Sequence, residues 1–463
     1  MNLDDTRRQK SGQPELARER KGEALKVTRS VEASTAIHDT ESPSSNGLME
    51  QVVARDNLKQ ALKRVRQNQG SPGIDGMTVD ELAPYLVQHW LTVKQQLLTG
   101  THVPKPVKAQ AIPKRNGGIR TLGIPCVLDR FIQQATLQVL QPRFDPSFSQ
   151  HSYGFRPGRR AHQAVGAAQR YIQDGRRWVV DIDLEAFFDR VNHDMLMGKL
   201  AKRIADKRLL GLIRRYLEAG IMAHGIVMER HQGTPQGGPL SPLLANVLLD
   251  EVDKELEKRG HAFCRYADDC NVYVRSRRAG EDVKEMLKRL YAKLKLRINE
   301  EKSAVAKPWD RQFLGFRFWV AKGKIVKRAC GAKALAAMKE RVRSSTSRSG
   351  GKSIEQIATD LKVYLTGWKG YFRPAETPGV FANLDGWIRH RLRAVMLKQW
   401  KQGTTVYREL RARGLSQHAA ASVASSRRSW WAMAGTSALN VALPGTYFDA
   451  LGVPRLGPRA LNF

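Results

Sequence analysis

The sequence feature that most constrains this chain is a pair of adjacent aspartates between two runs of β-forming residues. Residues 263–267, Phe-Cys-Arg-Tyr-Ala, precede Asp268 and Asp269, and an alternating apolar pattern resumes at Val272. This pattern predicts a β-hairpin with two carboxylates at its turn. Adjacent carboxylates repel each other, so holding both ionised against a sheet favours a bound cation. A polar hairpin tip is the alternative interpretation, because Asp is common in turns.

A second acidic stretch lies upstream, on a predicted strand at 178–184. Its even-numbered residues are apolar and share one face, whereas Asp181 and Asp183 share the other. An acidic face opposite an apolar one again favours a metal ion. We expect Asp183 to be the ligand because it lies nearer the end of the strand, and Asp181 to be the solvated member. The alternative is that both are ordinary surface residues.

Together, Asp183, Asp268 and Asp269 would make a three-carboxylate site for two divalent ions. Two such ions activate a 3′-hydroxyl group and stabilise the leaving pyrophosphate of an in-line displacement. Mg²⁺ suits oxygen ligands that are shared with substrate phosphates. The expected chemistry is therefore template-directed nucleotidyl transfer.

Residues 110–125 predict a strand, a tight turn and a return strand. Lys114 and Arg120 flank the turn, and two cations on one side of a hairpin suit a triphosphate. A solvated hairpin rim is the alternative. Further helices are predicted at 51–67, 127–141, 162–174, 195–217, 241–260, 353–368 and 381–400.

The charge of the chain indicates a polyanionic partner. Its 463 residues include 78 Lys and Arg against 44 Asp and Glu, a formal net charge of +34, with 41% hydrophobic residues. Basic residues recur along the whole chain, so a long nucleic acid is the favoured partner and an anionic membrane surface the weaker alternative. No apolar run reaches the length of a membrane span, and the N-terminus lacks the apolar core of a signal peptide. We therefore expect no membrane association.

The four cysteines, Cys126, Cys264, Cys270 and Cys330, form no C-x-x-C pair. This usage predicts a reducing, cytoplasmic setting with neither structural zinc nor a disulfide framework.

Two basic segments are candidates for nucleic-acid contact. The loop 151–160 mixes aromatic residues with arginines, among them Arg156, as in surfaces that follow a backbone and stack on bases. The predicted helix at 381–400 carries a basic face opposite its apolar stripe, and we expect it to bind nucleic acid rather than to be merely solvated. That face comprises Arg389, Arg391, Arg393 and Lys398.

The acidic motifs resemble those of reverse transcriptases. Tyr266-Ala-Asp-Asp269 resembles their palm motif, Asp183-Leu-Glu-Ala-Phe-Phe188 their first acidic motif, and Pro235-Gln-Gly-Gly238 their nucleotide-site loop. The resemblance implies two Mg²⁺ ions on the three aspartates and dNTP substrates. It also implies roles for four further residues: Lys114 and Arg120 contact the triphosphate, Gln236 contacts the nucleotide or template, and Phe188 excludes a 2′-hydroxyl group.

Within that class the chain resembles the group II intron-encoded reverse transcriptases and maturases, from about residue 48 onward. The segments that carry this likeness are 71–76, 152–157, 367–372, 384–389, 437–440 and 447–448. The resemblance implies group II intron RNA, an RNA template with a DNA primer, and target DNA as partners, with assistance to splicing and retromobility. Many relatives carry a C-terminal endonuclease with Cys and His ligands. No Cys follows Cys330 and no His follows His418, so we expect no nuclease domain and a primer from another source, such as a nascent DNA strand.

The expected fold is α+β, a right-hand polymerase with an antiparallel palm sheet and an α-helical thumb and maturase domain. The boundaries we expect are a flexible basic tail at 1–47, fingers at 48–175, palm at 176–330, thumb and maturase region at 331–420, and a nucleic-acid-contacting tail at 421–463. Three alternatives stay open: an RNA-binding splicing maturase without polymerase activity, an RNA-dependent RNA polymerase, which Phe188 disfavours, and a retron-type or CRISPR-associated reverse transcriptase.

Overall fold

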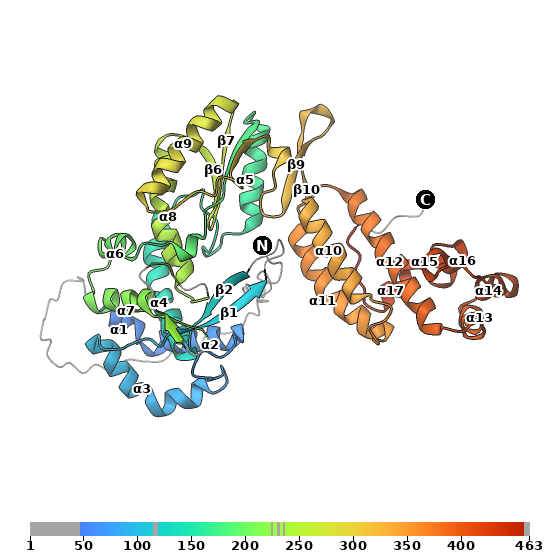
Figure 1. Ribbon diagram of the computed structural model, residues 1–463, viewed down its shortest axis with the longest axis horizontal. Coiled ribbons are helices and arrows are strands. Elements are labelled where there is room, and N and C mark those ends of the chain that lie inside the picture. Colours follow the sequence, from blue (N-terminus) through green and yellow to red (C-terminus); the bar gives the residue numbers. More distant parts are fainter. Residues whose placement is uncertain (1–46, 114–118, 224–225, 229–231, 235–236, 458–463) are drawn as a thin grey trace, which may run out of the picture. The chain divides into compact units, whose positions relative to one another are not determined.

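The computed structural model describes residues 47–113, 119–223, 226–228, 232–234 and 237–457 (Figure 1). The chain divides into two compact units, and each is described by itself. The first comprises the residues up to 149 together with 185–252 and 291–297, and the second comprises 150–184, 253–290 and 298–463. The mixture of helices and mostly antiparallel sheets confirms the α+β prediction. The tail expected at 1–47 lies, up to residue 46, outside the described residues.

The first unit combines helices with a four-stranded sheet of order β2-β1-β4-β5. Its strands are β1 (Val107–Pro113), β2 (Ile119–Ile124), β4 (Ile221–Ala223) and β5 (Ile226–Met228). Its helices are α1 (Leu48–Val52), α2 (Arg55–Asn68), α3 (Leu82–Thr99), α4 (Val127–Phe144), α6 (His193–Ala201) and α7 (Lys207–Glu218). Antiparallel pairing of β1 with β2 confirms the predicted hairpin. Helix α4 packs against α1 and α2 and buries ten of its 18 residues.

The sheet of the second unit has the order β6-β7-β3-β8, and every neighbouring pair is antiparallel. Its strands are β6 (Ala262–Tyr266), β7 (Asp269–Val274), β3 (Trp178–Ile182) and β8 (Ala304–Ala306). The predicted acidic hairpin and acidic strand are thus both present, and β3 lies directly beside β7. Helix α8 (Ser241–Lys258) begins in the first unit and ends in the second.

Helices cover both faces of this sheet. Helix α5 (Ala161–Gln173) packs on one face, where Tyr171 contacts Tyr273. Helix α9 (Arg277–Lys293) packs on the other: a Cβ at Gly280 would lie 2.5 Å from the Val305 side chain and 3.6 Å from that of Val180. The small residue therefore permits the close helix–sheet approach that buries the even-numbered face of β3.

A two-stranded hairpin, β9 (Phe316–Val320) and β10 (Val326–Cys330), precedes the C-terminal helices. These are α10 (Ala332–Ser345), α11 (Ile354–Phe372), α12 (Pro378–Trp400), α13 (Gly403–Ala412), α14 (Gln417–Ala424), α15 (Trp430–Ala434), α16 (Ser437–Ala442) and α17 (Gly445–Ala450). Ser353 and Gln356 form a capping box at the start of α11. Helix α12 contacts α11, α13, α15 and α17, so it is the centre of this helical region (Figure 1).

The segment after α17 returns to α12. The Asp385 carboxylate accepts hydrogen bonds from the backbone N–H of Leu456 and of Gly457, each at 2.9 Å. All four cysteines are buried free thiols. Among the described residues, no helix is both long enough and apolar enough to cross a membrane.

Candidate active site

The register of β3 with β7 determines which acidic residues share a face. Asp181 lies opposite Asn271, and the last pair of the ladder is Ile182 with Cys270. Continuing the register by one residue brings Asp183 opposite Asp269. Because directly opposed residues project on the same face of a sheet, these two predicted ligands project together from the end of the strand pair.

The hairpin between β6 and β7 closes with a two-residue turn. Tyr266 pairs with Asp269, which leaves Ala267 and Asp268 at the turn. Ala267 has a φ of 58°, in the left-handed region that side chains with a Cβ rarely adopt. The two adjacent carboxylates therefore differ in position: Asp268 is in the turn itself, and Asp269 begins β7.

The four acidic residues of this region influence one another. Burial, followed by the charges of Asp268, Asp181 and Asp183, raises the pKa of Asp269 to about 7. A carboxyl group in such surroundings is costly to ionise unless a cation compensates it. The site thus combines negative charge with partial burial, a combination that is typical of functional sites.

Asp181 and Asp183 are held differently, although they share a face. The Arg311 guanidinium donates a 2.7 Å hydrogen bond to Asp181, whose side chain is 19% exposed. The Asp183 carboxylate is 38% exposed and lies 3.8 Å from the exposed ammonium group of Lys302. The Asp183 backbone is fixed, since its N–H donates to Ser303 Oγ and its carbonyl accepts from the Asn299 N–H. Asp183 is therefore the more available ligand of the two.

The acidic residues at the end of the strand pair have the chemistry of a metal site. The group consists of carboxylates, which are the ligands that Mg²⁺ prefers, and the repulsion that raises the pKa of Asp269 would be relieved by a cation. Within the described part of the chain, however, no group of three or more His, Cys, Asp or Glu residues is arranged to hold a metal ion. The residues thus fit Mg²⁺ in chemistry and in charge, and ligation by Asp183, Asp268 and Asp269 stays a prediction.

A fully buried arginine supports the acidic turn. Arg265 is 0% exposed and forms an ion pair with the equally buried Asp253, with Nη2 and Oδ2 2.6 Å apart. The same guanidinium donates a 2.9 Å hydrogen bond from Nη1 to the carbonyl oxygen of Ala267, and a 2.8 Å hydrogen bond from Nη2 to Ser152 Oγ. Arg265 therefore links the left-handed turn residue to α8 and to the loop before α5.

Sequence reasoning treated Arg265 only as a strand residue and missed this role. One signal was present: a charged residue occurs in a strand whose other members are apolar or aromatic. A charge at such a position is rarely fully buried unless it is paired.

The loop before α5 packs directly on the same turn. The Tyr153 N–H donates to the Arg265 carbonyl, and the Arg265 N–H donates to the His151 carbonyl. At Gly154 a Cβ would lie 2.2 Å from the Ala267 backbone nitrogen. Only glycine permits so close an approach, so Gly154 is a second supporting residue that the sequence did not reveal.

Arg156, in the same loop, was expected on an open surface, and that placement is wrong. Its side chain is 7% exposed and donates a 3.0 Å hydrogen bond to the Ser152 carbonyl. The guanidinium therefore stabilises the loop that supports the hairpin.

Of the residues expected at the nucleotide, Arg120 and Phe188 are described, and both belong to the first unit. Lys114 and Gln236 fall outside the described residues, and Arg120 lies on β2, paired through its backbone with Ile112. Phe188 is half-buried in the short 3₁₀ helix Phe187–Asp189, and its carbonyl accepts a 2.7 Å hydrogen bond from the Thr234 N–H. This hydrogen bond ties Phe188 to the residue that directly precedes the predicted nucleotide-site loop.

The basic face expected on α12 is only partly exposed. Arg389 is 4% exposed and is paired with Asp385 and Asp449, and Arg393 is 8% exposed and donates to the Leu443 carbonyl. Their expected exposure is wrong because helices pack on more than one side of α12. Arg391 is half-buried and Lys398 is exposed. Contact of these residues with nucleic acid stays a prediction.

Comparison with known proteins identifies the class. Residues 112–318, which contain both acidic elements, match the family model described as reverse transcriptase (RNA-dependent DNA polymerase). Residues 335–414, from α10 to the loop after α13, match the group II intron maturase-specific domain. The polymerase and maturase domains expected from the motifs are thus confirmed.

Individual relatives agree with this assignment. Protein YkfC of Escherichia coli (strain K12) is 33% identical over 287 residues, which cover 53% of this chain and 75% of that protein. The group II intron-encoded protein LtrA of Lactococcus lactis subsp. cremoris is 36% identical over 215 residues, covering 46% of this chain and 34% of LtrA. The putative COX1/OXI3 intron 1 protein of Saccharomyces cerevisiae is 30% identical over 214 residues, which cover 46% of this chain and 25% of that protein.

The chain belongs to the group II intron reverse transcriptase and maturase family. It spans three quarters of YkfC but only about a third of LtrA. Among solved structures, a partial Cas6-RT-Cas1–Cas2 complex is 27% identical with a TM-score of 0.36, covering 56% of this chain and 43% of that one. That structural likeness is too distant to carry an argument.

Proposed function

We propose that this chain is an RNA-directed DNA polymerase whose site is formed by Asp183, Asp268 and Asp269. The observation that carries the proposal is the register of β3 with β7, which opposes Asp183 to Asp269 beside a turn that bears Asp268. These carboxylates would hold two Mg²⁺ ions, which supply activation of a primer 3′-hydroxyl group and stabilisation of the leaving pyrophosphate. The chain itself supplies the geometry, through the buried Arg265 and the close approach of Gly154.

The proposal includes four further residues, whose roles follow from the resemblance to reverse transcriptases. Lys114 and Arg120 contact the triphosphate, and Gln236 contacts the nucleotide or the template. The bulky Phe188 crowds the 2′ position of the incoming sugar. The substrates are therefore dNTPs.

We further propose that the chain binds its group II intron RNA and assists splicing and retromobility. The match to the maturase-specific domain and the net charge of +34 support this role. The other partners are an RNA template with a DNA primer, and target DNA. Four buried free thiols are consistent with action in the reducing cytoplasm.

The proposed domain boundaries are those of a right-hand polymerase. Fingers extend over 48–175, the palm over 176–330 and the helical thumb and maturase region over 331–420. Residues 421–463 contact nucleic acid. Residues 1–47 contain eight Lys and Arg and eight Asp and Glu, so their composition does not support the expected basic tail.

A second candidate is a splicing maturase that binds RNA but does not polymerise. One observation favours it: within the described residues, no three acidic or imidazole groups are already arranged around a metal position. Mutual repulsion of the carboxylates accounts for the same observation, so the polymerase stays the favoured function.

Primer extension with Mg²⁺ on an RNA template separates the two candidates. The wild-type chain is expected to incorporate dNTPs. Asp268→Asn should abolish incorporation, with RNA binding retained in a filter assay. Absence of incorporation by the wild-type chain on every template tested, with RNA binding intact, would establish the non-polymerising maturase instead.

A further inference from the structure

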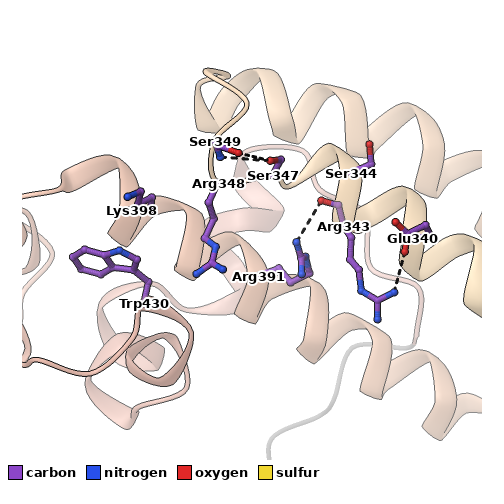
Figure 2. Close-up of a pocket in the computed structure, with 9 residues that line it drawn as sticks. All are labelled: Glu340, Arg343, Ser344, Ser347, Arg348, Ser349, Arg391, Lys398 and Trp430. Carbon is purple, nitrogen blue, oxygen red and sulfur yellow. Dashed lines mark hydrogen bonds and ion pairs between the residues drawn. The ribbon is translucent and has the colours of Figure 1, made fainter.

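A basic cavity lies in the helical C-terminal region, between the end of α10, the loop after it, α12 and α15 (Figure 2). Its volume is about 720 Å³, within the range of ligand pockets in proteins. Serines of the loop contribute to the lining. The ionisable and aromatic lining residues are Glu340, Arg343, Arg348, Arg391, Lys398 and Trp430.

The charge of the lining is strongly unbalanced. Four basic residues face one acid, a formal charge of +3, and that acid, Glu340, already pairs with Arg343 at 3.1 Å. Burial and the nearby charges of Arg343 and Arg348 lower the pKa of Arg391. Cations gathered in this way favour the arrival of an anion.

The basic side chains are held in different ways. Arg391 donates from Nε to Thr346 Oγ1 at 2.7 Å and lies over the Trp387 ring, so its guanidinium is fixed. Arg348 is exposed and extends from the loop toward α12, with Arg391 on one side and Trp430 and Lys398 on the other (Figure 2). A fixed guanidinium beside exposed cationic side chains suits a phosphate group.

An aromatic surface borders the charge cluster. Trp430 is half-buried on α15 and lines the cavity, whereas its neighbour Trp431 packs against His390 with ring centroids 4.0 Å apart. Arginines next to an accessible indole are the combination by which proteins hold unpaired nucleotides, with phosphate on the cations and base on the ring. The serine hydroxyls of the loop add groups able to hydrogen-bond a 2′-hydroxyl.

We propose that this cavity binds an unpaired nucleotide of an RNA strand, with its phosphate among Arg348, Arg391 and Lys398 and its base against Trp430. The site deepens the RNA-binding part of the proposed function and rests on it. Glu340, Arg343, Arg348, Arg391 and Lys398 all lie within the residues that match the maturase-specific domain. The cavity is separate from the acidic residues of the sheet and requires no metal ion.

The test measures binding of the full chain to a short labelled single-stranded RNA and to an RNA duplex, over a series of salt concentrations without Mg²⁺. Arg348→Gln and Lys398→Gln should each reduce the slope of log K against log salt by about 0.7, the value for one phosphate contact on a single strand. Trp430→Ala should weaken single-strand binding by about fivefold or more, and duplex binding less.

Matched controls distinguish RNA binding at this cavity from the general attraction between a basic protein and RNA. Lys333→Gln on α10 and Arg408→Gln on α13 remove the same charge from exposed positions outside the cavity, and Trp431→Ala removes the neighbouring indole. These variants should retain wild-type slopes and affinity. Circular dichroism establishes that each variant is folded.

The outcomes distinguish the cavity from the wider proposal. Equal losses in the control and cavity variants, or wild-type affinity in all cavity variants, would overturn the cavity as an RNA site and leave the polymerase proposal intact. A wild-type chain that binds no RNA would instead remove the RNA-binding role on which the cavity depends.

Discussion

The Arg265 guanidinium donates a 2.9 Å hydrogen bond to the carbonyl oxygen of Ala267, a residue whose backbone is left-handed. A non-glycine residue in this conformation costs about 1–2 kcal/mol, so the turn needs such support. The arginine itself is tolerated in the core because Asp253 neutralises it. A buried ion pair thus stabilises the geometry of the acidic hairpin.

Arg265→Met should destabilise the chain by about 3–5 kcal/mol, because it leaves Asp253 buried without its partner. The double variant Arg265→Met, Asp253→Leu should recover most of that stability, since apolar residues replace both charges. It should not recover the rate of dNTP incorporation, because the bond to Ala267 is still absent. Thermal unfolding and single-nucleotide incorporation measure the two effects. Full activity in the stable double variant would show that Arg265 has no positioning role.

Gly154→Ala should lower the incorporation rate, since its Cβ would meet the Ala267 backbone nitrogen at 2.2 Å and displace the turn. The matched control is Gly166→Ala on α5, where the nearest atom is the flexible end of Arg170 at 3.9 Å. In a helix that change is expected to stabilise by about 0.5–1 kcal/mol. Steady-state incorporation and thermal unfolding of both variants give the comparison. Equal activities would contradict a tight fit at Gly154.

Asp183→Asn should impair catalysis, whereas Asp181→Asn should mainly impair stability. Loss of Asp183 removes a proposed ligand and should reduce kcat by about a thousandfold, which corresponds to several kcal/mol of lost metal stabilisation. Loss of Asp181 breaks the pair with Arg311 and should mainly lower stability, by about 1 kcal/mol. Single-turnover kinetics and unfolding of both variants test this. A larger kinetic defect in Asp181→Asn would reverse the assignment.

Asp269→Asn should stabilise the metal-free chain, because it removes a carboxylate that burial and three other acids disfavour. The expected rise in Tm is about 2–4 °C for about 1 kcal/mol. Mg²⁺ should raise the Tm of the wild type and have a smaller effect on the variant. Asp310→Asn, an exposed acid elsewhere in the same unit, is the control. A lower Tm for metal-free Asp269→Asn would be the contrary result.

Phe188→Val should admit ribonucleotides, since it removes the bulk proposed to crowd the sugar's 2′ position. The ratio of kcat/KM for a dNTP to that for the matching NTP should fall by about 10- to 200-fold, as for other small steric differences in a pocket. Parallel assays with both nucleotides on one primer–template provide the ratio. An unchanged ratio would assign the discrimination to another residue.

Alternation alone was sufficient to predict the two acidic elements of the sheet. Asp181 and Asp183 follow a period of two, and β-forming residues bracket Asp268 and Asp269, so each element is encoded locally. Their adjacency is not encoded locally. It was inferred from the metal chemistry that the three carboxylates share and from the resemblance to reverse transcriptases, and the β3–β7 register supports it.

The predictions failed where the exposure or role of a side chain depends on segments that are distant in the sequence. Arg389 and Arg393 follow a basic helical face in the sequence, but other helices and the chain after α17 cover that face. Arg265 and Gly154 acquire their roles only from groups on other elements. The local pattern of residues in a sequence does not show which distant segment will pack against a given side chain.

The residues after α17 return to α12 and form polar contacts with its buried charged residues. Asp385 accepts from the N–H groups of Leu456 and Gly457, while Arg389 pairs with Asp449 and with Asp385 itself. Detachment of this last segment and α17 would remove the two backbone donors of Asp385 and the second carboxylate partner of Arg389, leaving only the Asp385–Arg389 pair inside the helical region. The C-terminal segment therefore stabilises α12, and local unfolding of that segment is coupled to local unfolding of α12.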